Sequence, residues 1–143
     1  MQRYFTEKPL DENSTIKILG DDAHHMIQVM RMSPGDEVYI VAAKETYIMT
    51  ILSGTSKEVI LETKEQVLKT NEMPIKVSIA CGLPKGDKLE LITQKGTELG
   101  IYKFIPTITS RVDVKLKGEF KKLDRLNRIA LEASKQSKRS IIP

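Results

Sequence analysis

One segment in the middle of the chain, LPKGDKLELITQKGTELG at residues 83–100, combines lysines, a carboxylate and glycines at helical spacing. Lys88, Lys95 and Glu98 fall on one stripe of the expected helix, beside its apolar face. Ammonium groups in a cleft can bind phosphate and stabilise negative charge that develops during a reaction. The same side chains can also lie at a domain edge, with their stems on apolar surface and their charges in water. Spacing alone leaves both interpretations open.

Basic residues are concentrated near the C-terminal end of the sequence. Residues 1–72 hold 8 Lys and Arg against 12 Asp and Glu, whereas residues 115–139 hold 9 against 3. The second segment includes Arg125 and Arg128 and favours a polyanionic partner, because each phosphate that a protein neutralises releases counterions. A solvated helix face carries the same kind of charge run, so this pattern does not decide the function.

A second polar group lies in the N-terminal third. His24, Gln28 and Arg31 recur at i, i+4 and i+7, and His25 adjoins them. Such a row contacts phosphates or bases, or is an ordinary polar surface. The two histidines have no Cys or carboxylate at ligand spacing, so the sequence does not predict a metal site. Cys81 lies in an apolar run and is predicted to be a buried small hydrophobe rather than a nucleophile.

Short β-rich runs surround the histidines. Strands are predicted at RYF, TIKILG, EVYIVA, TYIMTILSG and EVILETKEQ. Between the second and third runs, DDAHHMIQVMRM predicts a helix with its buried face formed by Ala23, Met26, Ile27 and Met30. These elements predict an antiparallel meander with one small helix, in a small barrel or sandwich. The polar segment at residues 65–74 separates a first domain, residues 1–72, from a second, residues 73–143.

Strand, helix, strand and helix alternate from residue 75 onward. IKVSIACGL and IYKFIPTIT are near-continuous apolar runs, typical of strands that are covered on both faces. This order predicts a right-handed βαβ unit with a parallel sheet. Lys85 follows the first of these strands, at the carboxyl end of the sheet, where open α/β sheets bind ligands. RSIIP predicts the start of a third strand, and the second domain is therefore expected to be cut short.

The two helices of this domain carry their own signals. Asp87 and Glu90 predict a capping box, and Gly100 predicts a C-terminal cap. The buried face of the first helix is predicted to be Leu89, Ile92, Gly96 and Leu99, with Gly96 allowing a close neighbour. The apolar stripe of the second helix ends in small residues, so another backbone or a ligand can approach there, beside Gln136 and Arg139.

Composition excludes several classes of protein. With 40% hydrophobic and 29% charged residues, the chain is globular, and no apolar run approaches the ~20 residues of a membrane span. The first residues include acidic side chains and no apolar core, unlike a secretory signal. A single cysteine excludes an internal disulfide and favours the reducing cytoplasm.

Several of these stretches together resemble the RsmE family of SPOUT-class RNA methyltransferases, which modify N3 of a uridine in small-subunit ribosomal RNA. The similar segments occur in the family's order and cover most of the chain: RYF, HHMIQVMRMSPGDEV, LPKGDKLELITQKGTELGI, IPTITSRV and LDRLNRIALEASKQSKRSIIP. The resemblance implies an α+β fold. It consists of an N-terminal PUA-like β-barrel that binds RNA, followed by the first half of an α/β SPOUT domain, which is knotted and Rossmann-like.

The resemblance also implies S-adenosylmethionine as methyl donor and a homodimer with its active site near the interface. It implies that Arg139 is the leading catalytic candidate, with Lys95 and Glu98 beside it. The implied RNA-binding residues, together with those of the basic segment, are His24, His25, Arg31, Lys85, Lys88, Arg125, Arg128 and Gln136. Gln94 matches the family's motif as well.

The family's glycine-rich cofactor loops have no counterpart in the sequence. We therefore expect no cofactor-binding residues in this chain and no methylation by the chain alone. A second hypothesis, of a non-catalytic RNA-binding module associated with the ribosome, stays open on the sequence. Neither hypothesis calls for a membrane or a metal.

Overall fold

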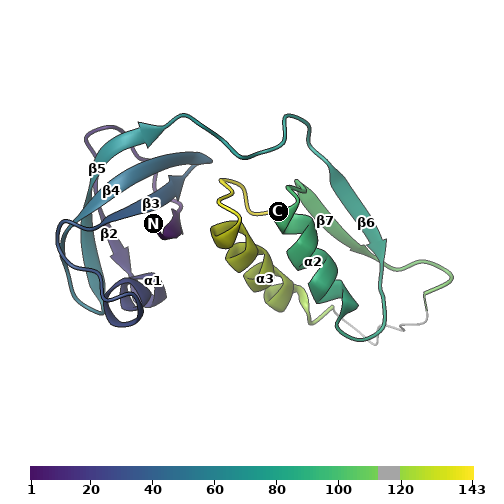
Figure 1. Cartoon of the computed structure of the whole chain (residues 1–143). Coiled ribbons are helices and arrows are strands. Elements are labelled where there is room, and N and C mark those ends of the chain that lie inside the picture. Colours follow the sequence, from purple (N-terminus) through teal and green to yellow (C-terminus); the bar gives the residue numbers. More distant parts are fainter. Residues whose placement is uncertain (113–119) are drawn as a thin grey trace. The chain divides into compact units, whose positions relative to one another are not determined.

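The computed structural model describes residues 1–112 and 120–143, and these form two compact units. The first unit is Met1–Thr70 and the second unit is Asn71–Pro143 (Figure 1). Within residues 1–112 and 120–143, no helix is both long enough and apolar enough to cross a membrane.

A five-stranded sheet in the order β1-β3-β4-β5-β2 builds the first unit. Its strands are β1 (Arg3–Thr6), β2 (Thr15–Leu19), β3 (Glu37–Ala42), β4 (Glu45–Gly54) and β5 (Glu58–Val67). The predicted antiparallel meander is confirmed for β3, β4 and β5. β1 instead pairs in parallel with β3, which the long connection between them makes possible, since a parallel pair needs a crossover of a dozen or more residues.

Alternation along the strands places one face of this sheet in an apolar core. In β2, for example, Ile16 and Ile18 point inward and their neighbours are exposed. Register shifts in β4 interrupt its pairing with β5 at two places and help the sheet to curl. The buried core residues are Tyr4, Ile16, Ile18, Ala23, Met26, Val38, Ile40, Ala42, Tyr47, Met49, Ile51, Val59 and Leu61.

The single helix predicted between β2 and β3 is two short pieces. α1 (Gly20–His24) is α-helical, and η1 (His25–Val29) is a π-helix, with the Met30 N–H bonded to the His25 carbonyl. Ala23 and Met26 are buried as predicted, but Met30 is exposed. A π-helical turn contains more residues than an α-helical one, so the side chains after it point in a different direction. This rotation turns Met30 away from the core.

The second unit has a parallel two-stranded sheet and two helices, which confirms the predicted βαβ arrangement. The strands are β6 (Ser78–Gly82) and β7 (Lys103–Thr107), and the helices are α2 (Lys88–Glu98) and α3 (Leu123–Gln136). Figure 1 shows α2 and α3 side by side, and the two pack against each other. β6 was predicted to be covered on both faces, but alternate residues along it are exposed. Only one face of β6 is therefore packed by the described residues.

The buried face of α2 differs from the predicted one. It consists of Leu89, Thr93, Gly96 and Thr97, whereas Leu99 is 77% exposed. Two threonines can replace leucine here because each hydroxyl donates to its own helix, Thr93 to the Leu89 carbonyl at 2.9 Å and Thr97 to the Thr93 carbonyl at 2.7 Å. Facing them, α3 buries Leu126, Ala130, Ala133 and Ser134. The small residues toward the end of α3 therefore allow α2 to pack closely.

The two ends of α2 show one wrong prediction and one confirmed one. Asp87 precedes the helix but makes no side-chain cap, and its carbonyl instead accepts the N–H groups of Glu90 and Leu91. The predicted capping box is absent because the Glu90 carboxylate binds Arg125. Gly100 is a C-terminal cap with φ +98°, and the Ile101 N–H bonds to the Gly96 carbonyl at 3.1 Å, as in a Schellman motif.

Gly100→Ala is expected to lower the free energy of unfolding of the second unit by about 1–2 kcal/mol, because a Cβ is strained at positive φ. The added Cβ also lies 3.2 Å from the Met73 side chain, which must move. Gly82→Ala is the matched control, since its Cβ meets its nearest neighbour at an ordinary 3.4 Å. Urea unfolding of the two variants measures the difference, and equal losses contradict the account of this cap.

Candidate RNA-binding and catalytic residues

Basic side chains collect at the carboxyl end of the β6–β7 sheet. Both strands end there, at Gly82 and Thr107, and the first turns of α2 and α3 follow. The described connections and first turns, residues 83–90, 108–112 and 120–125, carry six basic residues against three acidic ones. The basic residues are Lys85, Lys88, Arg111, Lys121, Lys122 and Arg125, and the acidic ones are Asp87, Glu90 and Asp124. This end of the sheet therefore has a net positive charge.

An ion pair joins the first turns of the two helices at this end. The Arg125 guanidinium lies 2.8 Å from the Glu90 carboxylate, and its side chain is 69% exposed. Water and salt screen the pair at its arginine end, whereas the Glu90 side chain is only 15% exposed. Arg125 therefore keeps most of its charged surface accessible to a polyanion.

Three residues predicted from the sequence meet in a groove between α2 and α3. Gln94 from α2, and Arg128 and Gln136 from α3, line a cavity of about 490 Å³. Its other lining residues are Asp87, Glu90, Leu91, Ile129, Glu132 and Ala133. The groove has the volume of a small-molecule site. Its three carboxylates give it a mixed charge rather than a phosphate-binding one.

The predicted catalytic residues do not gather around the basic end of the sheet. Lys95 and Glu98 lie near the C-terminus of α2, where their side chains pair at 2.8 Å. Lys88 is at the other end of the same helix, about 10 Å from Lys95 and about 15 Å from Glu98 along the axis at 1.5 Å per residue. α2 therefore separates the predicted residues into two groups.

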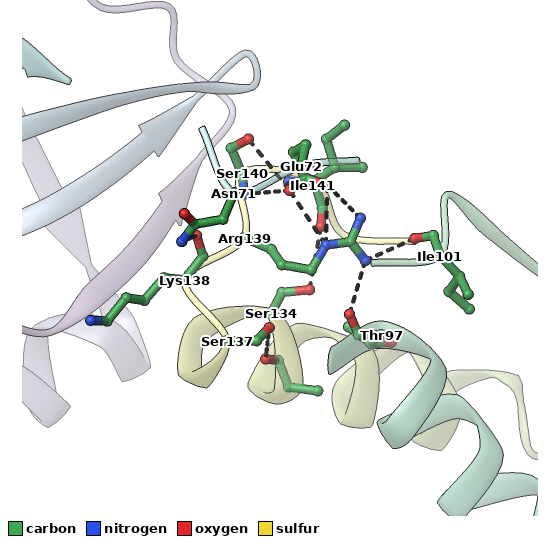
Figure 2. Close-up of polar contacts among 11 residues, drawn as sticks. Asn71, Glu72, Thr97, Ile101, Ser134, Ser137, Lys138, Arg139, Ser140 and Ile141 are labelled. Carbon is green, nitrogen blue, oxygen red and sulfur yellow. Dashed lines mark hydrogen bonds and ion pairs between the residues drawn. The ribbon is translucent and has the colours of Figure 1, made fainter. Parts of the chain in front are cut away.

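Arg139 is buried at the same end of the unit as Lys95 and Glu98. Its side chain is only 3% exposed and binds the Glu72 carboxylate, with Nη2 2.7 Å from Oε2 (Figure 2). Its Nη1 donates to the carbonyls of Thr97 at 3.2 Å and Ile101 at 2.8 Å. The guanidinium thus binds protein groups on two sides. A catalytic role for Arg139 stays a prediction, and these contacts favour a structural one.

Glu72 was not identified from the sequence. It lies in a polar segment that was interpreted as a domain boundary, and 67 residues separate it from its partner Arg139. Burial of the Glu72 carboxyl acts to raise its pKa, but hydrogen bonds from Arg139 and from the backbone N–H groups of Ser140 and Ile141 outweigh it. The net result is a pKa below the ordinary value of 4.5. The carboxylate is therefore charged at neutral pH and stabilised in that form.

In the first unit, one of the two predicted histidines has a defined anchor. The Tyr4 hydroxyl and His25 Nδ1 are 2.9 Å apart, at hydrogen-bond distance. Burial, with a smaller contribution from Asp22, raises the pKa of Tyr4 to about 12, so the hydroxyl stays protonated. His24 and Arg31 are exposed, and Arg31 has a φ of 53°, a left-handed conformation that is uncommon outside glycine.

In the part of the chain that the structure describes, no group of three or more His, Cys, Asp or Glu side chains is arranged to hold a metal ion. Cys81 is half-buried, with its thiol 3.4 Å from the Gly82 carbonyl.

Both units match known families of domains. Residues 71–143 match the model of an RNA methyltransferase domain, and residues 18–64 match that of an RNA methyltransferase PUA domain. The architecture is thus a PUA-like domain followed by a methyltransferase domain, as predicted.

Named relatives agree with these domain matches. A ribosomal RNA small subunit methyltransferase E from Bacillus subtilis is 44% identical over 100% of this chain and 58% of its own length. A crystal structure of the enzyme of the same name from Neisseria gonorrhoeae, bound to S-adenosyl methionine, superposes with a TM-score of 0.86 at 24% identity. It matches 100% of this chain and 60% of its own. A Legionella pneumophila methyltransferase with the same bound cofactor gives 0.84 at 25% identity, over 99% of this chain and 60% of its own.

The fold and the domain matches define a chain that combines a PUA domain with an RNA methyltransferase domain. Within that class the chain belongs to the RsmE family. It spans about three fifths of the length of these three relatives.

The lowered pKa of Glu72 predicts an acid-sensitive contribution to stability. Because the folded-state pKa lies below 4.5, the contribution is complete above about pH 4.5 and is lost as pH falls through the folded-state value. Glu72→Gln is expected to cost about 3 kcal/mol at pH 7, because it leaves Arg139 buried without a counter-charge. The difference from the wild type should shrink below pH 4.5, as the wild-type carboxyl is itself protonated.

Urea unfolding at several pH values measures this effect. Glu132→Gln is the matched control, because its ion pair with Lys135 is exposed at Glu132 and it should show little change at any pH. A Glu72→Gln loss that stays constant down to pH 3 contradicts the assignment.

Proposed function

We propose that this chain contributes the RNA-binding surfaces of an S-adenosylmethionine-dependent methyltransferase that modifies N3 of a uridine in small-subunit ribosomal RNA. Membership of the RsmE family supports the reaction, and the names of its relatives support the class of RNA. The observation that carries RNA binding is the cluster of basic residues where two parallel strands end, since such strand ends are the usual ligand site of α/β sheets.

RNA would contact the second unit at this basic end. Lys85, Lys88 and Arg125 would neutralise phosphates there. Arg128 and Gln136 line the groove between α2 and α3 and would extend the contact along α3. Contacts of this kind supply affinity and register but little sequence information.

In the first unit we propose that RNA contacts His24, His25 and Arg31. His24 and Arg31 are exposed, and the Tyr4 hydroxyl fixes the orientation of the His25 ring. The first unit is acidic overall, so its attraction for RNA would come from this local group rather than from its net charge.

S-adenosylmethionine supplies an activated methyl group when bound. The described residues of this chain do not suit it well: the α2–α3 groove has adequate volume, but Asp87, Glu90 and Glu132 line it where an adenine needs an apolar slot. We therefore assign no cofactor contact to the described residues and expect the chain alone not to transfer methyl groups.

Catalysis at N3 requires loss of the N3 proton and stabilisation of negative charge on the ring, for which a nearby cation is suited. Lys95 and Glu98 remain predicted for this step, whereas the contacts of Arg139 with Glu72 and two carbonyls favour a structural role for the third predicted residue. These three residues lie away from the basic end of the sheet, so we expect that RNA binding can be altered without altering them.

A homodimer and a cytoplasmic location, where ribosomes are made, are further parts of the proposal and rest on the family alone.

Neutralising Lys88 and Arg125 together (Lys88→Gln, Arg125→Gln) is expected to weaken binding of a small-subunit ribosomal RNA fragment. Each lost phosphate contact should reduce the slope of log affinity against log salt by roughly 0.7–0.9, so the double variant should lose about 1.5. Fluorescence anisotropy of labelled RNA between 50 and 200 mM salt measures the slope, a range in which such contacts change affinity strongly.

Lys138→Gln is the control for loss of a single positive charge, because Lys138 is exposed just after α3, away from the basic end of the sheet. If the double variant has the same slope of log affinity against log salt as the wild type, the proposed surface is wrong. A methyl-transfer assay with the same RNA and S-adenosylmethionine tests the expected inactivity of the chain alone. Transfer by the wild-type chain contradicts the expected inactivity, and RNA binding without transfer fits both the proposal and a non-catalytic module.

A further inference from the structure

Three separate segments of the second unit meet at the Glu72–Arg139 ion pair. Glu72 lies next to the first residue of the unit, Thr97 and Ile101 flank the C-terminal end of α2, and Arg139 follows α3. Figure 2 shows the Arg139 side chain extended between the Glu72 carboxylate and the two carbonyls at the end of α2. The Glu72 side chain is 12% exposed and that of Arg139 is 3% exposed, so the pair is largely removed from water.

On the α2 side, the arginine completes the end of a helix. The last carbonyls of a helix have no partner within it and carry partial negative charge, which a cation stabilises. The Thr97 carbonyl accepts from the Gly100 N–H as well as from Arg139, and the Ile101 carbonyl accepts from Arg139 at 2.8 Å. The guanidinium fork is suited to bind a carboxylate and two carbonyls at once.

On the other side, the carboxylate binds the backbone that follows Arg139. Glu72 Oε1 accepts from the Ser140 N–H at 2.8 Å and from the Ile141 N–H at 3.0 Å. Neither of these N–H groups touches the Arg139 side chain. Arg139 therefore acts on residues 140 and 141 through Glu72, whose position it fixes.

The turn that delivers Arg139 to this position is strained. Lys138 has a φ of 58°, and the Arg139 N–H bonds back to the Ser134 carbonyl at 3.0 Å, as at a helix C-terminus that usually has glycine. The left-handed conformation is unfavourable for lysine because its Cβ crowds the following carbonyl oxygen. Such a conformation persists only where surrounding contacts determine it, and the Glu72 contacts provide them.

We propose that Arg139 is a positioning residue, which through Glu72 fixes the direction in which the chain leaves α3 and holds the start of the second unit against the end of α2. The chain beyond this point returns toward the sheet, because Pro143 lines a small cavity together with Phe104 and Pro106 of β7. This role does not depend on RNA binding or methyl transfer. It explains why a buried arginine lies away from the basic end of the sheet.

Amide hydrogen exchange of the 143-residue chain, measured residue by residue by NMR, tests the proposal. In Arg139→Gln, the N–H groups of Ser140 and Ile141 should exchange at least tenfold faster, although the altered side chain touches neither. Amides of Val59 and Leu61, in the core of the first unit, should keep their rates, since local opening leaves a separate unit protected. Arg139→Lys keeps the charge but not the fork and should give an intermediate rate.

Arg125→Gln is the matched control, because it breaks an ion pair of similar length at the opposite end of α3, between an exposed arginine and a largely buried carboxylate. It should leave Ser140 and Ile141 unchanged. If the Ser140 and Ile141 amides of Arg139→Gln exchange at rates within twofold of the wild-type rates, the proposal is overturned. If Arg139→Gln does not fold, Arg139→Lys decides: faster exchange at Ser140 and Ile141 supports the proposal, and wild-type rates there overturn it. Loss of RNA affinity with unchanged exchange would instead identify Arg139 as a direct RNA contact.

Discussion

The buried ion pair between Glu72 and Arg139 is the interaction on which the second unit depends. It closes one end of the unit by joining its first residues to the C-terminal ends of both helices. A buried charge without its partner is strongly unfavourable, whereas a well-bonded pair roughly offsets the cost of removing two ions from water. The net stabilisation by the pair is therefore small. Its main effect is to fix the positions of three chain segments relative to one another.

That geometry gives the second unit two ends with different chemistry. One end, where β6 and β7 finish, has exposed basic side chains on connections and first turns. The other end has a buried, charge-balanced network that uses its arginine internally. A polyanion can approach the first end without displacing any buried contact. At the second end a phosphate would have to compete with a carboxylate already bound to the guanidinium.

Much of the fold could be predicted because it follows from local patterns. Apolar alternation located the strands of the first unit, and the order of strands and helices fixed the parallel pairing of β6 and β7. The errors have physical causes that act beyond the local sequence. The π turn at His25 exposes Met30, and threonines that bond to their own helix take the place of leucine in the buried face of α2. Glu90 binds Arg125 rather than the helix terminus.

The candidate site was less predictable than the fold. Residue type and family resemblance identified Arg139, but they could not indicate that Glu72 would bind it, since nothing in the sequence links two residues so far apart. Helical spacing placed Lys88 and Glu98 on one stripe, yet the length of α2 keeps them at opposite ends. A shared helix face is therefore not evidence of a shared site.

The most direct measurement is an NMR titration of the isotope-labelled chain with a small-subunit ribosomal RNA fragment, following the backbone amides of every assigned residue. The account predicts shifts at Lys85, Lys88 and Arg125 and in the His24–Arg31 segment, with Thr97, Arg139 and Ser140 unperturbed. Shifts centred on Arg139 and the C-terminal end of α2, with the basic end of the sheet silent, would contradict it.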